Sequence, residues 1–267
     1  MAKLRLSGHV ARTVRKVHMQ TKRIVEQYHE DGFVIVRQLF SADEIATLDQ
    51  HLRDFISDVV PTLDSGDVYF EDTPNRPVKS IFRLEEHDPY FQQLADDRRI
   101  RDLVTALLGD ADFTRLSTGF FGKAAGDGSV VPCHQDNAFQ FWVPPEALGV
   151  TIAVDASTVD NGALICQQGS HRLGMLPHQP SGVMGFSMQL VEPPDLAAHP
   201  EVALCMNPGD VAVHHITTVH RSDANRTDRA RRQLAIGYRS SRAQGDEAAR
   251  TAHRALLAEL HARNPPP

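Results

Sequence analysis

The sequence predicts a mostly β protein in which helices flank a core of antiparallel strands. Five short segments between residues 113 and 241 are rich in β-forming residues, and turns containing Gly, Pro, Asn or Asp separate them. Helical periodicity is clearest nearer the ends of the chain, for example where Ile45, Leu48 and Leu52 recur at helical spacing. Strands of this kind are typical of a β-sandwich or β-barrel.

The first expected elements follow one another closely. A short helix is expected to end at Gly32, and the apolar segment 33–40 follows it as a strand. Ser41 then stands three residues before Glu44, which is the spacing of a capping box, so a second helix is expected to begin there. Residues 97–108 have the pattern of a further amphipathic helix.

The β-rich segments come next, and a helical tail ends the chain. The expected strands lie within residues 113–124, 149–157, 162–168, 210–218 and 231–241. The tail from Glu247 to Arg263 has the composition of a helix, and a run of prolines stops it. We therefore expect one domain over residues 25–267 with a C-terminal helix, preceded by a basic extension over residues 1–24.

That extension is distinguished by its charge. Seven basic residues and no acidic one occur between Met1 and Val25, although the whole chain has a net charge of −6. An acid-free start that contains arginine resembles a transit peptide, but it lacks serine enrichment and a long apolar stretch. A solvated helical or frayed extension is the preferred interpretation.

Composition excludes several classes of protein. With 41% hydrophobic and 23% charged residues, the chain is neither collagen-like nor wholly disordered. Its acidic balance argues against a nucleic-acid partner, and it has no run of about 18 apolar residues that would span a membrane. Three cysteines do not suggest a disulfide scaffold, so we expect a cytoplasmic protein, and no obligate protein partner is evident.

The pattern His-x-Asp occurs twice, at His29/Asp31 and at His134/Asp136. The first pair is expected on a helix, where residues i and i+2 do not share a face, so these two side chains cannot readily chelate one metal ion. If the second pair lies on a strand, an imidazole and a carboxylate project from the same face. His134 and Asp136 are therefore the candidate metal ligands.

A third ligand is needed from elsewhere in the chain. The candidates are His171, His214, His215 and His220. His220 is the strongest, because it ends an expected strand just before a polar turn; His214 and His215 alternate faces, so one is expected in the core and the other on the surface. Two histidines and one carboxylate form the facial triad of non-haem Fe(II) oxygenases, which leaves three coordination positions open.

Four blocks of sequence together resemble the phytanoyl-CoA dioxygenase family. They are EQYHEDGFVIVRQLFSADEI at 26–45, HQD at 134–136, DNGALICQQGSHRLG at 160–174 and GDVAVHHITTVHRSDANRTDRARR at 209–232. The resemblance implies a double-stranded β-helix, or jelly roll, of the cupin-like type. It also implies an oxygenase that uses Fe(II), 2-oxoglutarate and dioxygen, with ascorbate as a possible assay component.

The resemblance also implies roles for individual residues. His134, Asp136 and His220 match the iron ligands, and Arg231 matches the arginine that binds the far carboxylate of 2-oxoglutarate. Its neighbour Arg232 should face the opposite side of the strand. Three further residues match positions that can touch this cosubstrate: Ser222, Lys123 and Gln135.

The substrate is less well defined by the sequence. Residues near the metal-binding segment are the candidate substrate contacts, namely Asn137, Phe139, Trp142 and Phe121. We see no basic cluster suited to a coenzyme A tail, and therefore expect a small polar metabolite or a specialised natural product. A carboxylate at Asp136 favours hydroxylation, oxidative cyclisation or desaturation over halogenation, because the related halogenases have a small residue there.

Two other functions remain open from the sequence. One is a cupin-like metal dioxygenase that does not use 2-oxoglutarate, and Arg231 is the residue that discriminates against it. The other is a non-catalytic metal-binding member of the same fold, which the complete set of four matched residues makes the weaker alternative.

Overall fold

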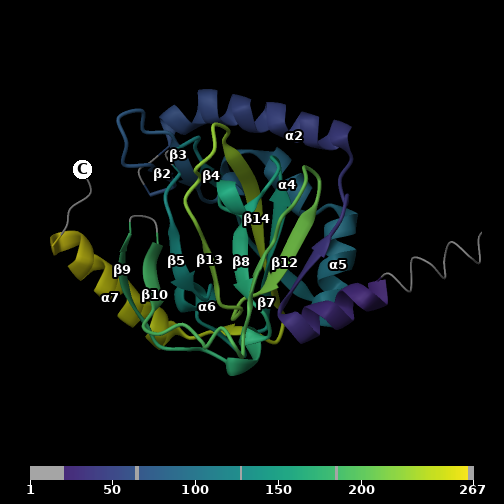
Figure 1. Ribbon diagram of the computed structural model, residues 1–267, viewed down its shortest axis with the longest axis vertical. Coiled ribbons are helices and arrows are strands. Elements are labelled where there is room, and N and C mark those ends of the chain that lie inside the picture. The colour runs from purple at the N-terminus through teal and green to yellow at the C-terminus, as the bar shows by residue number, and fades with distance from the viewer. Residues whose placement is uncertain (1–20, 64–65, 127, 184–185, 264–267) are drawn as a thin grey trace, which may run out of the picture.

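Two antiparallel sheets face each other in the computed structural model, which describes residues 21–63, 66–126, 128–183 and 186–263 (Figure 1). Most of the expected basic extension, residues 1–20, lies outside the described part. The expectation of an antiparallel β core with flanking helices, in the form of a jelly roll, is confirmed.

The larger sheet has seven strands. In spatial order they are β1 (Phe33–Val36), β12 (Val211–His215), β7 (Ala147–Ala153), β14 (Arg231–Ser240), β4 (Phe113–Lys123), β3 (Val78–Ile81) and β2 (Val68–Phe70). The N-terminal strands β1 and β2 form the two edges of this sheet, and strands from the middle and the C-terminal part of the chain lie between them.

The facing sheet has four strands. They are β11 (Glu201–Ala203), β8 (Leu164–Gln167), β13 (His220–Ser222) and β5 (Val131–His134). Two small ribbons complete the β structure, and they pair β9 (His178–Val183) with β10 (Phe186–Leu190), and β6 (Trp142–Val143) with β15 (Gln244–Gly245).

Helices begin and end the described chain, and those that precede β4 contribute to the core against the larger sheet. The helices are a first helix over 21–31, α2 (Ala42–Asp54), α3 (Leu84–His87), α4 (Pro89–Ala95), α5 (Arg98–Leu108), α6 (Asn137–Gln140) and α7 (Glu247–Arg263). The capping box at Ser41 and Glu44 is present at the start of α2, and Gly109 follows α5 in the left-handed conformation. None of the described helices combines the length and apolar content needed to cross a membrane.

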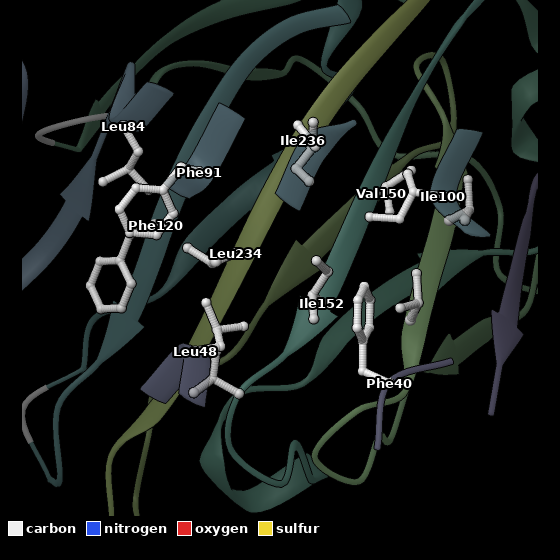
Figure 2. Packing of buried hydrophobic residues seen from close by; sticks show 14 of the residues in the cluster. Phe40, Leu48, Leu84, Phe91, Ile100, Phe120, Val150, Ile152, Leu234 and Ile236 are labelled. Atoms are coloured by element: carbon white, nitrogen blue, oxygen red, sulfur yellow. The ribbon is translucent and has the colours of Figure 1, made fainter. Parts of the chain in front are cut away.

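The main hydrophobic core fills the space between the seven-stranded sheet and its helices. Leu48 of α2, Phe91 of α4 and Ile100 of α5 are fully or almost fully buried there. They pack with residues such as Ile152 of β7 and Leu234 of β14, as Figure 2 shows. Burial of this apolar surface is the main force that fixes the sheet against the helices.

The opposite face of the same sheet has small or polar side chains. Along β14, Gln233, Ala235 and Gly237 alternate with the core residues and line a cavity between the two sheets. On β7, Gly149 occupies the corresponding face. The absence of bulky side chains at these positions leaves room for a bound molecule.

Candidate active site

The cavity between the sheets has a volume of about 630 Å³. Strands β4, β7, β12 and β14 supply one wall, and β5, β8 and β13 supply the other. Three side chains from the facing sheet and its margin meet there: His134, Asp136 and His220. The cavity is thus built on two rigid sheets rather than on a single loop.

These three side chains are arranged as a group that could hold one metal ion. Each offers one ligand atom, and all three atoms lie within 4.8 Å of one another. Nε2 of His134 is 3.4 Å from Oδ1 of Asp136, and Nε2 of His220 is 3.5 Å from the same oxygen. Two imidazole nitrogens and one carboxylate oxygen on one face are the donor set of a facial triad.

Hydrogen bonds to the backbone orient both imidazole rings. Nδ1 of His134 lies 2.7 Å from the carbonyl of Pro132, and Nδ1 of His220 lies 2.9 Å from that of Thr218. In the neutral tautomer that a metal ligand must adopt, a proton on Nδ1 satisfies each contact and leaves the Nε2 lone pair for the metal ion. Burial, together with the nearby His134, lowers the pKa of His220 to about 3, so its ring is neutral, as a metal ligand must be.

The charge of Asp136 is also fixed by its surroundings. Burial alone would raise its pKa, but the neighbouring imidazoles of His220, His134 and His214 outweigh that effect. The pKa is therefore held well below its usual value, and the group stays a carboxylate.

The structure brings His134 and Asp136 together by a different route from the one that strand alternation suggested. Strand β5 ends at His134, and Asp136 is the helical N-cap residue of α6. The chain therefore turns between them, and the assumption that both residues lie on one strand was wrong. The turn, rather than a shared strand face, directs the carboxylate back towards the histidine.

The position of His220 also differs from expectation. It does not end the strand that contains His214, because β12 ends at His215 and the chain then crosses to the facing sheet. His220 begins β13, where it pairs directly with His134 of β5. This cross-strand pairing places the two imidazole ring centroids 4.2 Å apart.

Sequence reasoning underestimated His214. Its side chain is 6% exposed, lines the cavity and places Nε2 2.8 Å from Oδ2 of Asp136. His215 points the other way and contacts Thr217 through Nδ1. The alternation of residues along β12 could have indicated this position. Val211 and Val213 belong to the core that faces the helices, so the adjacent His214 must face the cavity.

Arg231 lies in the same cavity and is 4% exposed. One of its terminal nitrogens donates a 2.6 Å hydrogen bond to Oε1 of Gln233, but its buried Nε has no partner among the described residues. Burial lowers its pKa to about 10, so the guanidinium still carries its charge at neutral pH. Within the described chain no carboxylate lies in ion-pair contact with it, which makes it a site for an anion.

Arg232 provides the contrast that the sequence anticipated. It points away from the cavity, where its guanidinium binds Asp155 at 2.8 Å and Asp49 at 2.6 Å. The two adjacent arginines of β14 therefore differ in their partners. Arg232 forms ion pairs with two carboxylates, whereas Arg231 forms none with the described residues.

Two other expected cosubstrate contacts behave differently. Ser222 lines the cavity, and its hydroxyl donates a 2.8 Å hydrogen bond to the carbonyl of Gly162. Lys123 pairs with Arg231 across the sheet but is not among the cavity-lining residues, because its ammonium group turns to the carbonyl of Ser129. Burial, with a further contribution from Arg231, lowers its pKa to about 7.

Gln135 and Asn137 are not on the cavity wall either. The amide of Gln135 is buried, donates to the carbonyls of Gly174 and Thr217, and accepts from a backbone N–H. The side chain of Asn137 instead bonds both backbone polar groups of Trp142. Both residues hold the turn after β5 in shape, so direct contact with cosubstrate or substrate is not supported for either one.

The aromatic candidates do line the cavity. Phe121, Phe139 and Trp142 are all on its wall, together with Phe82. The guanidinium groups of Arg250 and Arg239 lie over the ring of Trp142, with their Cζ atoms 4.4 and 4.8 Å from the ring centroid. Sequence reasoning did not assign a role to Arg250, which comes from α7 and also lines the cavity.

The other His-x-Asp pair is absent from the described metal-binding group, as expected, and both of its residues make structural contacts. The Asp31 carboxylate accepts a 2.7 Å hydrogen bond from Gln168, and the carbonyl of His29 contacts His171. These contacts tie the first helix to the loop after β8. His171 is likewise absent from the described metal-binding group.

The residues present suit the two groups that this arrangement implies. Neutral imidazoles and a monodentate carboxylate are ligands for Fe(II), and a buried, charged arginine in the same cavity suits the distal carboxylate of a keto-diacid. Fold and site together define the class of non-haem Fe(II)- and 2-oxoglutarate-dependent oxygenases.

Within that class, the chain belongs to the phytanoyl-CoA dioxygenase family, whose family model matches residues 28–233. A probable alpha-ketoglutarate-dependent hypophosphite dioxygenase of Stutzerimonas stutzeri is 28% identical over 79% of this chain and 76% of its own. The ectoine dioxygenase of Sphingopyxis alaskensis is 26% identical over 79% of this chain and 73% of its own. The crystal structure of EctD from S. alaskensis with bound Fe superposes with a TM-score of 0.69 and 25% identity, covering 82% of this chain and 76% of that one.

Proposed function

We propose that this enzyme hydroxylates, or oxidatively cyclises or desaturates, a small molecule bound between its two sheets. The single observation that carries the proposal is that His134, Asp136, His220 and Arg231 open onto one cavity. Arg231 favours the use of 2-oxoglutarate over the cupin-like alternative, because a buried guanidinium that forms no ion pair with a carboxylate of the described residues requires an anionic partner.

His134, Asp136 and His220 are the residues that would hold Fe(II). When bound with 2-oxoglutarate and dioxygen, iron of this class supplies the oxidising power to attack an unactivated C–H bond. The chain's own contribution is to orient both imidazoles and to keep Asp136 ionised. A carboxylate at that position also supports hydroxylase-type chemistry over halogenation.

Arg231 would bind the far carboxylate of 2-oxoglutarate. Its contact with Gln233 fixes the guanidinium plane, and Ser222 presents a hydroxyl from the opposite wall of the same cavity. A preorganised, charged donor of this kind is worth about 1.5–3 kcal/mol per charge-assisted hydrogen bond. Lys123 would contribute to the local positive charge without direct contact.

The remaining walls indicate the character of the substrate. Phe82, Phe121, Phe139 and Trp142 present aromatic surface to the cavity, and Leu116 adds an aliphatic one. Hypophosphite and ectoine, which the names of two relatives specify, are small and polar. A cavity of about 630 Å³ with aromatic walls instead favours a larger, partly apolar compound, such as a specialised natural product.

The decisive test is product analysis under oxygen-18 gas. Purified protein would be incubated with Fe(II), ascorbate, 2-oxoglutarate and a panel of candidate compounds, with succinate release measured alongside mass spectrometry. Hydroxylation predicts succinate formation and one heavy oxygen atom in the product, whereas cyclisation or desaturation predicts loss of two hydrogens. Absence of substrate-stimulated succinate across a broad panel would contradict the proposal.

A further inference from the structure

His214 contacts the proposed metal site but is not part of the triad. Its side chain is 6% exposed and projects from β12 into the cavity. Nε2 of His214 lies 2.8 Å from Oδ2 of Asp136, whereas the nitrogens of His134 and His220 face Oδ1 of the same carboxylate. The two oxygens of Asp136 therefore have different partners.

The hydrogen-bond direction follows from the geometry. A contact of 2.8 Å between Nε2 and an ionised carboxylate requires a proton between them, because two lone pairs would repel at that distance. Nδ1 of His214 is buried and has no hydrogen-bond partner among the described residues. A tautomer with its proton on Nε2 fits both observations, since it buries no unpaired N–H at Nδ1.

The ring is held in this orientation by the neighbouring strand. His214 pairs with Gly149 of β7, and a Cβ atom added to Gly149 would lie only 2.8 Å from Cε1 of the His214 ring. Gly149 therefore allows the imidazole to lie flat against the β7 backbone. Any larger residue would push the ring towards Asp136 or out into the cavity.

We propose that His214 is a positioning residue that fixes how Asp136 binds the metal. By donating to Oδ2, it leaves Oδ1 as the oxygen that the carboxylate offers to an ion and disfavours bidentate ligation. Monodentate ligation preserves the three open positions that a facial triad must leave for cosubstrate and dioxygen. The inference rests on the proposed function, because it requires a metal ion at the triad.

Metal affinity tests this role without reference to turnover. Anaerobic titration with Fe(II), and with Mn(II) as a redox-stable probe, would compare the wild type with His214→Phe, His214→Asn and His214→Gln. Loss of an outer hydrogen bond to a metal ligand typically weakens metal binding about 10- to 100-fold. We expect that loss in the Phe variant, which has no donor, and in the Asn variant, whose amide is too short to reach Oδ2.

His214→Gln provides the rescue. The glutamine amide can place an N–H near the position of Nε2, so its metal affinity should stay within a few-fold of the wild type. His215→Phe is the matched control, because the adjacent ring points away from the cavity and its loss should not alter metal affinity. Melting temperatures would establish that each variant is folded, and the smaller polar Asn variant provides the result if the Phe variant is not.

The outcomes distinguish a failure of the role proposed for His214 from a failure of the metal site itself. Wild-type affinity in both the Phe and Asn variants, or an equal loss in the folded Gln and Phe variants, would overturn the role of His214. Metal binding that survives Asp136→Ala without change would instead overturn the triad, and with it the proposed function. Loss of affinity with Phe and Asn but not with Gln supports the inference.

Discussion

The two faces of strand β14 perform different tasks with alternating residues. Towards the helices, Leu234 and Tyr238 are fully buried, and the Tyr238 hydroxyl donates to a carbonyl of α4. Towards the cavity, Arg231, Gln233 and Gly237 leave space and present polar groups. One face therefore maximises packing, and the other gives up packing to create a binding site.

This difference indicates where substitutions should affect stability and where they should affect activity. A strand has a side-chain period of two, so neighbouring residues can be changed independently with respect to the two faces. If the separation holds, variants on the helix face lose stability and retain ligand affinity. Variants on the cavity face should show the reverse.

The largest effect is expected from Asp136→Ala on the cavity side. Removal of the only carboxylate in the described metal-binding group should abolish turnover, because one ligand and the charge that balances the metal are both lost. The melting temperature should change little, since the turn around Asp136 is held by Gln135 and Asn137. Wild-type rates of substrate-stimulated succinate release in this variant would contradict the ligand assignment.

Leu234→Ala tests the opposite face. Truncation of a fully buried leucine leaves a void between the sheet and its helices, and should lower the free energy of unfolding by about 2–5 kcal/mol. Denaturant titration measures this loss, and 2-oxoglutarate affinity of the folded protein should be unchanged. A large loss of affinity without a loss of stability would break the separation between the faces.

Arg231→Ala and Arg232→Ala form the closest matched pair, because the two residues are adjacent on one strand. Loss of the Arg231 guanidinium should weaken 2-oxoglutarate binding about 10- to 150-fold, which corresponds to about 1.5–3 kcal/mol. Arg232→Ala should leave that affinity intact and lower stability by about 1–3 kcal/mol, because Asp155 and Asp49 lose their partner. Binding measurements and denaturant titrations that gave equal results for both variants would refute the assignment of sides.

The smallest effect at neutral pH concerns Lys123, whose buried amine has a pKa of about 7 in the folded protein. The unfolded chain retains this proton up to about pH 10.4, so it binds more protons than the folded state above pH 7. Stability contributed by the neutral lysine should therefore increase between about pH 7 and pH 10. Comparison with Lys123→Met isolates the effect, and a stability difference that stays constant over this range would show that the lysine is not perturbed.

Much of the fold could be predicted because it depends on local patterns. Turn residues separated the strands, and the Ser41–Glu44 spacing marked the start of α2. The resemblance of four sequence blocks to a known family was what brought His134, Asp136, His220 and Arg231 together in advance, and the structure places all four on one cavity. Turns and helix caps can be recognised in a single sequence because each requires particular residue types at fixed positions.

The rest depended on contacts between distant segments. Gln135 was expected beside the cosubstrate, but its amide is engaged by carbonyls from residues 174 and 217, far away in the sequence. Lys123 was also expected to contact the cosubstrate, but its ammonium group donates to the nearby carbonyl of Ser129 and does not line the cavity. The role of His214 depends on its contact with Asp136, and no local pattern predicted the turn that brings Asp136 there.

A metal ion at the triad and Arg231 are expected to hold 2-oxoglutarate together, and calorimetric titration of this acid tests that most directly. Mn(II)-loaded wild-type protein should bind one 2-oxoglutarate per chain. Affinity should fall at least about 10-fold either when the metal is withheld or when Arg231 is replaced by Ala. Binding that is equally tight in all three samples, or absent from the metal-loaded wild type, would contradict the account.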